Sequence, residues 1–182
     1  MSVLEIDVDR IAGLPGVNLR RAATADLAGL VALEAACFDA DQWSESAWGD
    51  ELAGEDRLVL VAETNGAAED DACQVYADIV AAACFHVVGQ TAELYRVMTA
   101  PAWRCLGIAT LLLVNGFDWA ARQGASEMLL EVRAGNGALS LYTDVGFTPL
   151  YERPNYYGPD RHALVMRCGL DGLGAEEERG DE

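Results

Sequence analysis

The sequence contains no lysine, so all 12 of its basic residues are arginines, against 30 acidic residues. The formal net charge of −18 disfavours nonspecific nucleic-acid binding, which depends on basic patches. A Walker loop, which requires G-K-[ST], is excluded, and the dinucleotide fingerprint G-x-G-x-x-G is also absent. No apolar run approaches the roughly 18 residues of a membrane helix. We therefore expect neither a nucleic acid nor a membrane as partner.

Histidine and paired cysteines are also scarce. The five cysteines form no C-x-x-C pair, and there are only two histidines. This pattern predicts neither a disulfide framework nor a metal site. Cys84 and His86 would share one face of a strand, but a filled core strand is a better interpretation than a catalytic pair. The acidic start of the chain, residues 1–10, is unlike a secretory signal, so we expect a cytoplasmic protein.

The length and composition suit one packed domain. The chain has 182 residues, of which 52% are hydrophobic. Residues 1–16 are expected to form a leader without periodicity, and residues 17–169 the domain. Residues 170–182 carry six acidic residues and one arginine, so we expect a solvated, disordered tail.

Periodicity and turn residues predict an alternation of strands and helices. Thr24 is expected to cap the first helix, and residues 65–74 are expected to form a polar loop insertion. Such an alternation predicts an α/β fold with a mixed sheet covered by helices. Strands are predicted at 17–21, 58–63, 75–88, 92–99, 128–133, 147–151 and 163–167, and helices at 25–37, 46–53, 107–123 and 137–144.

A turn between the strand at 92–99 and the helix at 107–123 is suited to an anion. It reads Arg104-Cys105-Leu106-Gly107-Ile108-Ala109. A glycine lets the backbone approach a ligand, and the free amides and dipole of a helix start favour negative charge. Arg104 adds a cation that suits phosphate geometry. A pyrophosphate-bearing cofactor would fit here, although R-x-x-G-x-A alone is equally compatible with an ordinary turn.

A carboxylate interrupts the apolar strand at 128–133. Glu131 stands in Leu130-Glu131-Val132-Arg133. A glutamate in such a strand is costly unless it is solvated or used in chemistry. Asn136, Leu141-Tyr142 and Val145-Gly146-Phe147 follow it.

Together with the turn at 104–109, these residues resemble the GNAT superfamily of acyl-CoA N-acyltransferases. The segment Arg153-Pro154-Asn155-Tyr156-Tyr157 narrows the resemblance to the RimI-type ribosomal-protein alanine N-acetyltransferases. It covers about residues 17–167. It implies a central, mostly antiparallel sheet flanked by helices, acetyl-CoA as co-substrate, and no metal. The acceptor it implies is a protein N-terminus, that of a small-subunit ribosomal protein beginning with alanine.

The resemblance also implies roles for individual residues. Glu131 corresponds to the general base and Tyr142 to the general acid. The wall of the acceptor groove would include Trp43, Tyr156 and Tyr157. The residues that would bind the cofactor are Val97, Met98 and Thr99 on the strand, Arg104, Cys105, Leu106, Gly107, Ile108 and Ala109 in the turn, and Asn136.

The implied reaction is direct attack of the amine on the thioester in a ternary complex. Glu131 would take the proton directly or through one water, and burial in its strand would raise its pKa toward a useful range. Alternatives remain for these side chains. Glu131 could be an ion-paired carboxylate, with Arg133 as partner, and Glu93 is a second candidate base. Tyr142, Tyr156, Tyr157 and Trp43 could serve packing alone.

Three functions are therefore open. The first is acetylation of a protein N-terminus, the second is acetylation of a small amine or a lysine side chain, and the third is non-catalytic binding of acetyl-CoA. Glu131 and Tyr142 together favour a catalyst over a binding module. We expect a monomer or a weak dimer.

Overall fold

The structure is a computed structural model that describes residues 16–64, 79–156, 158 and 160–171. Its described residues form two compact units. Residues 16–64, 79–84 and 96–113 make up the first, called here the N-unit, and residues 85–95 and 114–171 belong to the second, the C-unit. Strands β3 and β4 and helix α4 each contribute residues to both units.

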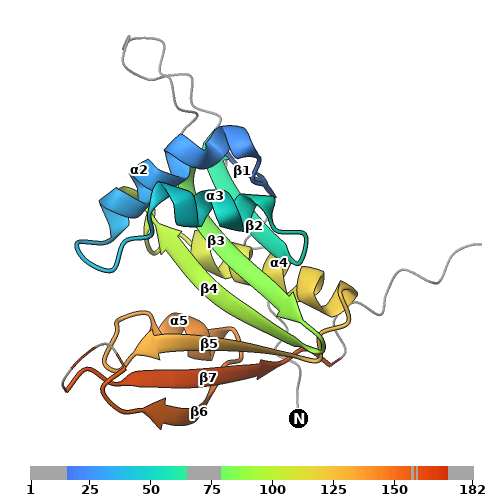
Figure 1. The fold of residues 1–182 in the computed structure, drawn as a ribbon, viewed down its shortest axis with the longest axis vertical. Coiled ribbons are helices and arrows are strands. Elements are labelled where there is room, and N and C mark those ends of the chain that lie inside the picture. Colours follow the sequence, from blue (N-terminus) through green and yellow to red (C-terminus); the bar gives the residue numbers. More distant parts are fainter. Residues whose placement is uncertain (1–15, 65–78, 157, 159, 172–182) are drawn as a thin grey trace, which may run out of the picture. The chain divides into compact units, whose positions relative to one another are not determined.

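Helices and strands alternate as the sequence predicts, with most boundaries within one or two residues (Figure 1). The strands are β1 Val17–Arg21, β2 Arg57–Thr64, β3 Ile79–Val88, β4 Thr91–Thr99, β5 Glu127–Arg133, β6 Thr148–Arg153 and β7 Ala163–Gly169. The helices are α2 Leu27–Cys37, α3 Glu45–Ala53, α4 Ile108–Arg122 and α5 Leu139–Asp144, with short 3-10 turns η1 Thr24–Asp26 and η2 Pro101–Trp103.

Among the described residues, the strands form a seven-stranded sheet in the order β1-β2-β3-β4-β5-β7-β6. Strands β4 and β5 are parallel, whereas β1–β2, β5–β7 and β6–β7 are antiparallel. The β4–β5 register runs from Thr91 opposite Glu127 to Leu94 opposite Leu130 and ends there. The predicted fold class, a mixed sheet flanked by helices, is confirmed.

The core of the N-unit lies between α2, α3 and one face of strands β2 to β4 (Figure 1). Leu30 and Leu33 of α2 and Trp48 of α3 are almost completely buried there. Ser44 is the N-cap residue of helix α3, and its hydroxyl accepts a hydrogen bond from the Ala47 amide at 3.1 Å. The strand residues of this core are Val59, Val61, Ala82, Cys84 and Met98.

The core of the C-unit is aromatic. The Phe147 ring lies 5.6 Å from that of Phe117 and 6.0 Å from that of Tyr142, with tilted and edge-on geometry that aromatic pairs prefer. Gly116 lies within helix α4 because the Phe85 ring packs against it. A Cβ atom at position 116 would come within 2.1 Å of that ring, so no larger residue fits without movement.

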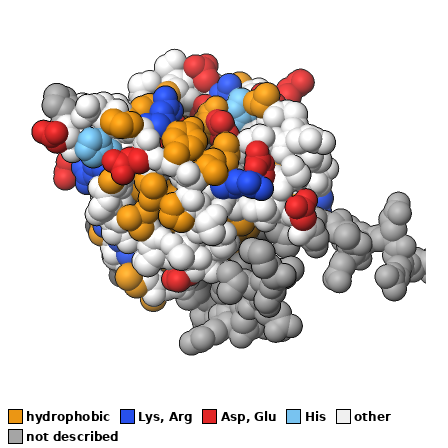
Figure 2. Space-filling model, turned by 90° about the horizontal axis from the view of Figure 1, so that it is seen from below, with side chains coloured by type: hydrophobic (Ala, Val, Ile, Leu, Met, Phe, Trp, Pro, Cys, Tyr) orange, Lys and Arg blue, Asp and Glu red, His pale blue; other side chains and the backbone are white. Residues whose placement is uncertain are grey.

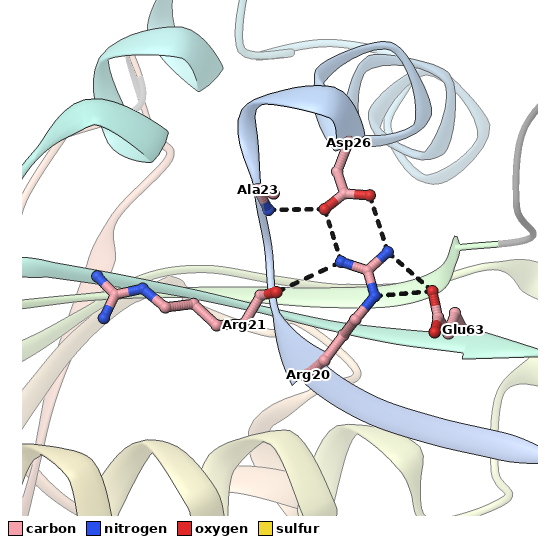
Figure 3. A network of polar contacts seen from close by, with 5 residues as sticks. All are labelled: Arg20, Arg21, Ala23, Asp26 and Glu63. Atoms are coloured by element: carbon pink, nitrogen blue, oxygen red, sulfur yellow. Dashed lines mark hydrogen bonds and ion pairs between the residues drawn. The ribbon is translucent and has the colours of Figure 1, made fainter.

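An arginine–carboxylate network fixes the start of the first helical segment (Figure 3). Arg20 donates to both oxygens of Asp26, at 2.7 and 2.8 Å, and to Glu63 at 2.8 Å. Asp26 in turn accepts a hydrogen bond from the Ala23 amide at 2.7 Å. The guanidinium of Arg20 holds the pKa of the Asp26 carboxyl below its usual value. The prediction that Thr24 caps this helix is wrong, because Thr24 lies inside the 3-10 turn η1, whose N-cap residue is Ala23 and whose Asp26 accepts the hydrogen bond from the Ala23 amide.

Strand β6 forms one edge of the sheet, with β7 as its neighbour. All six of its residues are exposed. The pairing with β7 shifts register between Pro149 and Tyr151.

Several expectations fall outside the described residues. These are the predicted leader apart from Gly16, the loop insertion at 65–74, the start of the strand predicted at 75–88, and the tail beyond Asp171. Within the part of the chain that is described, no helix has the length and apolar character to cross a membrane.

Candidate functional site

The turn that precedes helix α4 is anchored to the end of strand β4. The Nε–H of Arg104 donates to the Thr99 carbonyl at 3.0 Å, and the short η2 turn starts from Ala100, whose amide bonds to the Val80 carbonyl at 2.8 Å. The intrahelical ladder of α4 starts with the Leu111 amide, which donates to the Gly107 carbonyl at 3.0 Å. The amides before Leu111 lie at the helix start, where they have no partner within the helix.

The backbone of this turn twice enters the left-handed region. Cys105 has φ of 61° and Gly107 has φ of 85°. Successive amides in such alternating conformations form concave anion sites. The position where a Cβ of Gly107 would stand has no atom within 4 Å, so the backbone there is open to approach. Cys105 is exposed, and Leu106 is 48% exposed. The turn can therefore receive a phosphate group without rearranging buried side chains.

Strand β4 ends in the three residues predicted to hold the acetyl and pantetheine groups, Val97 to Thr99. The Thr99 carbonyl accepts a hydrogen bond from the Cys37 thiol at 3.3 Å in addition to that from Arg104. Burial raises the pKa of the Cys37 thiol, so at neutral pH it remains a donor. The β4–β5 pairing stops at Leu94, before these residues.

Glu131 lies on the more open face of strand β5. Burial alternates along the strand, with Met128, Leu130 and Val132 buried, while the Glu131 side chain keeps 31% of its surface exposed. The expectation that Glu131 is buried is therefore wrong. The strand pairs with β7, and none of the β5 residues on the face that carries Glu131 is buried. Solvation, rather than a catalytic use, is sufficient to explain why a carboxylate is tolerated here.

Arg153 of β6 is the ion-pair partner of Glu131, in place of the Arg133 that the sequence suggested. Its guanidinium carbon also lies 4.4 Å from the centre of the Tyr156 ring. The bond with Glu131 raises the pKa of Arg153, which stays charged. Arg153 thus links a predicted base to a predicted acceptor-groove residue. No local pattern indicates this pair, because its members are 22 residues apart along the chain.

The neighbourhood of β6 exposes large apolar groups. Leu150, Tyr151 and Tyr156 are 49%, 54% and 47% exposed. Figure 2 shows a face of the molecule on which hydrophobic side chains gather beside arginines and carboxylates. Tyr157, also predicted to line the acceptor groove, lies outside the described residues.

Tyr142 and Asn136 lie at helix α5. Tyr142 is 8% exposed, and its ring packs edge-on against Phe147. The Asn136 side-chain oxygen accepts from the Ala138 amide at 2.9 Å, which organises the turn into α5. Tyr142 therefore has a packing role, and Asn136 stabilises a turn.

Trp43, predicted to line the acceptor groove, packs against Trp48 with ring centres 4.9 Å apart. Its amide donates to Glu34 at 3.0 Å, and the guanidinium of Arg96 lies 5.1 Å from its ring centre. Glu34 and Arg96 were not singled out by the sequence. Glu34 follows Leu27 and Leu30 at helical spacings of seven and four, and this position on an apolar stripe is the signal that could have revealed it.

The Cys84–His86 pair shows no sign of an activated thiol. Cys84 is fully buried and donates to Glu51 at 3.2 Å. Burial, and then the charge of Glu51, raise the pKa of Cys84, which keeps it protonated. His86 bonds instead to the Tyr95 hydroxyl at 3.1 Å. Across the described ranges, no three His, Cys, Asp or Glu side chains are grouped to hold a metal ion.

The predicted site residues are divided between the units. The N-unit contains Trp43, Val97 to Thr99 and the turn 104–109, and the C-unit contains Glu131, Asn136, Tyr142 and Tyr156. An open pocket of about 500 Å³ also lies in the N-unit. Trp43 is its one predicted site residue, and the remaining lining is Ala47, Asp50, Glu51, Ala53, Gly54 and Arg57.

Comparison with known sequences points to one family. The model of the acetyltransferase (GNAT) family matches residues 27–147. The chain is 32% identical over 96 residues to the [ribosomal protein bS18]-alanine N-acetyltransferase of Haemophilus influenzae, covering 50% of this chain and 66% of that protein. It is 34% identical over 80 residues to the Escherichia coli K12 protein of the same name, covering 43% and 54%. The chain thus spans about half to two thirds of these relatives.

Solved structures extend the likeness. The E. coli ribosomal-protein-S18-alanine N-acetyltransferase has a TM-score of 0.73 and 26% identity, over 90% of this chain and 99% of that one. A Bacillus anthracis structure, described as a streptothricin acetyltransferase in complex with acetyl coenzyme A, shares the fold with a TM-score of 0.68 at 15% identity, over 85% and 99%.

Proposed function

Because the chain belongs to the acetyltransferase (GNAT) family, we propose that it moves an acetyl group from acetyl-CoA to the N-terminal amine of a protein. Family membership confirms the superfamily that the sequence motifs indicated. The acceptor we propose is an N-terminal alanine, that of a small-subunit ribosomal protein in the cytoplasm. The observation that carries this acceptor is the match to bS18-alanine N-acetyltransferases in both sequence and structure.

The turn at 104–109 fits the pyrophosphate of acetyl-CoA. A bound anion is favoured by the left-handed φ values at Cys105 and Gly107 and by the open space beside Gly107. It is also favoured by Arg104, which is exposed and carries a positive charge. Residues 97–99 would hold the thioester-bearing arm along strand β4. Asn136 would add a contact from the start of α5.

Glu131 is the proposed general base. A free α-amino group has a pKa of about 7.7–8.0, so a minority is neutral at pH 7, and the attacking nitrogen must lose a proton. A carboxylate whose side chain is 31% exposed can take that proton directly or through a water molecule. The nitrogen then attacks the thioester carbon, and a backbone amide of residues 97–99 would stabilise the oxyanion.

Tyr142 is the proposed general acid for the departing thiolate of CoA. The C–S bond breaks as the oxyanion collapses, and the thiolate takes a proton from the tyrosine hydroxyl. Helix α5 and the Phe147 ring hold this side chain in a fixed position. The C–N bond that forms and the C–S bond that breaks lie in the two substrates, and the chain exchanges only protons, which Glu131 accepts and Tyr142 donates.

Mass spectrometry of intact peptides tests the proposal. A hexapeptide beginning Ala-Arg, incubated with acetyl-CoA and the protein, should gain one acetyl group on its N-terminal nitrogen. The same peptide with a blocked N-terminus and an internal lysine should gain none. Turnover of that blocked peptide, or of a polyamine alone, would replace this acceptor with a side chain or a small amine. Tight CoA binding without turnover of any amine would leave a binding module.

A further inference from the structure

Glu34 is the one charged side chain that is buried among the described residues, with 1% of its surface exposed. It projects from helix α2 and accepts hydrogen bonds from two sources. The Trp43 amide donates to its Oε1 at 3.0 Å, and Arg96 donates from Nη2 to Oε1 and from Nε to Oε2, the latter at 3.4 Å. Both carboxylate oxygens are therefore engaged within the N-unit.

Arg96 contacts the segment between helices α2 and α3 at several points. It donates to the Asp41 carbonyl at 2.7 Å, and its guanidinium carbon lies 4.1 Å from the Phe38 ring centre and 5.1 Å from that of Trp43. Asp41 has φ of 59°, a conformation that a non-glycine residue adopts at a cost. The Arg96 guanidinium thus contacts three residues of the segment 38–43, called here the 38–43 loop, and one of them, Asp41, has a costly backbone conformation.

A buried ion pair is a poor device for stability alone, because apolar side chains of similar size often stabilise a core as well or better. What this pair provides is a fixed geometry for the 38–43 loop. Arg96 directly precedes Val97 to Thr99, the strand residues that we assign to the acetyl-bearing arm. The same residue therefore connects the loop that carries Trp43 to the strand that would carry the thioester.

We propose that Arg96 and Glu34 are positioning residues that hold the 38–43 loop as a wall of the acceptor site and thereby set the affinity for the acceptor. This inference rests on the proposed function, because it takes residues 97–99 and Trp43 as parts of one transferase site. Loss of the guanidinium fork would release the loop without removing any group that touches acetyl-CoA.

The test variant is Arg96→Lys. An ammonium keeps a charge beside Glu34 but cannot reproduce the planar, forked contact with Asp41 and the two rings. The matched control is Arg122→Lys, in which the arginine belongs to an exposed pair with Asp118 on helix α4. For Arg96→Lys we expect the acceptor-peptide KM to rise about tenfold or more, as displacement of a positioning group does. The KM for acetyl-CoA and the kcat should stay within about twofold, and the control should change neither.

Phe38→Leu provides a second variant with all charges intact. It removes the ring beneath the guanidinium and should raise the acceptor KM in the same direction, by a smaller factor. An unchanged acceptor KM in both variants would overturn the proposal. An equal fall in kcat/KM for the acceptor peptide and for acetyl-CoA would also overturn it. A purely structural pair lowers the fraction of active protein, which affects both substrates equally.

Fluorescence quenching separates this inference from the proposed function. The Trp43 contribution to the fluorescence is obtained by subtracting the signal of the same protein that also carries Trp43→Phe. Iodide should quench this contribution more strongly in Arg96→Lys than in the parent protein. If the parent acetylates no peptide, the proposed function fails, whatever the quenching shows. If the parent acetylates peptide while Trp43 quenching and acceptor KM are both unmoved in Arg96→Lys, only the positioning role fails.

Discussion

The two units each contain a glutamate–arginine pair, but the pairs occupy different environments. In the N-unit, the Glu34 and Arg96 side chains are 1% and 15% exposed, and in the C-unit, Glu131 and Arg153 are 31% and 46% exposed. Removal of one partner from a buried pair costs about 3–5 kcal/mol, whereas an exposed pair contributes about 0–1 kcal/mol. The buried pair is therefore expected to contribute more to stability, whereas the exposed pair leaves the Glu131 carboxylate accessible to solvent.

The largest expected effect concerns the exposed pair. Glu131→Gln should lower kcat by about 10²–10⁴-fold, the range for loss of a general base, while CoA binding and the urea midpoint stay nearly constant. Steady-state kinetics, calorimetric CoA titration and urea unfolding measure the three quantities.

Glu127→Gln is the matched control for that variant. Glu127 lies four residues before Glu131 on the same strand and on the same face of the sheet. Its side chain is also 31% exposed, and it forms an ion pair with Arg167. It should retain full turnover. Equal activity in the two variants would remove Glu131 from the reaction and make Glu93 the next carboxylate to replace.

The buried pair should respond in stability. Glu34→Ala leaves Arg96 without its carboxylate and the Trp43 amide without its acceptor, so the free energy of unfolding should fall by about 3–5 kcal/mol. Glu131→Ala should lower it by no more than about 1 kcal/mol. Urea denaturation followed by circular dichroism compares them, and equal losses would show that burial does not separate the two pairs.

Two glycines with positive φ extend the contrast to ligand binding. Gly107 of the N-unit and Gly89 of the C-unit have φ of +85° and +63°, and neither has an atom within 4 Å of a Cβ position. Alanine at either site should cost about 1–2 kcal/mol of backbone strain. Gly107→Ala alone should also weaken CoA binding, by about tenfold, or about 1.4 kcal/mol. If calorimetry gives the same dissociation constant for both variants, the turn at 104–109 does not hold the pyrophosphate.

The smallest effect belongs to a third pair of intermediate exposure. Arg20 and Asp26 are 34% and 11% exposed, and Arg20 lowers the pKa of Asp26. A carboxyl with a depressed folded pKa stabilises the fold above its unfolded pKa of about 3.8, and this contribution disappears as the pH falls through the folded value.

Asp26→Asn should therefore lower stability at pH 7 by about 1 kcal/mol, because the neutral amide loses the ion pair with Arg20, and by less as the pH approaches 3. Urea midpoints between pH 3 and 7 measure the difference from the parent. Asp118→Asn, in an exposed helix pair, is the control and should show little difference at any pH. A penalty for Asp26→Asn that grows toward low pH would reverse the assigned sign.

Local patterns were enough to predict the elements of the fold. Helix α4 was expected at 107–123 and spans Ile108–Arg122, because its apolar stripe and flanking glycines are short-range signals. The burial of Glu131 was misjudged, because apolar neighbours in sequence do not reveal which face of a strand is covered. The two ion pairs escaped detection for a related reason. Glu34 and Arg96 are 62 residues apart, and only the folded sheet brings them together.

The roles that we propose for the site residues come from sequence resemblance. The turn at 104–109 has the backbone shape expected of an anion site, so that part could be predicted from a glycine and a helix start. Arg153 could not, because no short-range pattern couples a strand residue to an arginine on a later strand.

The outer strand has a consequence for the behaviour of concentrated solutions. An edge strand presents free backbone groups that can recruit a strand from another molecule, which is a common route to fibrous aggregates. In β6, Pro149 lacks an amide hydrogen, and the register shift beside it interrupts the straight ladder that an incoming strand would need. We therefore expect this border to resist strand addition, even though its side chains are exposed along its whole length.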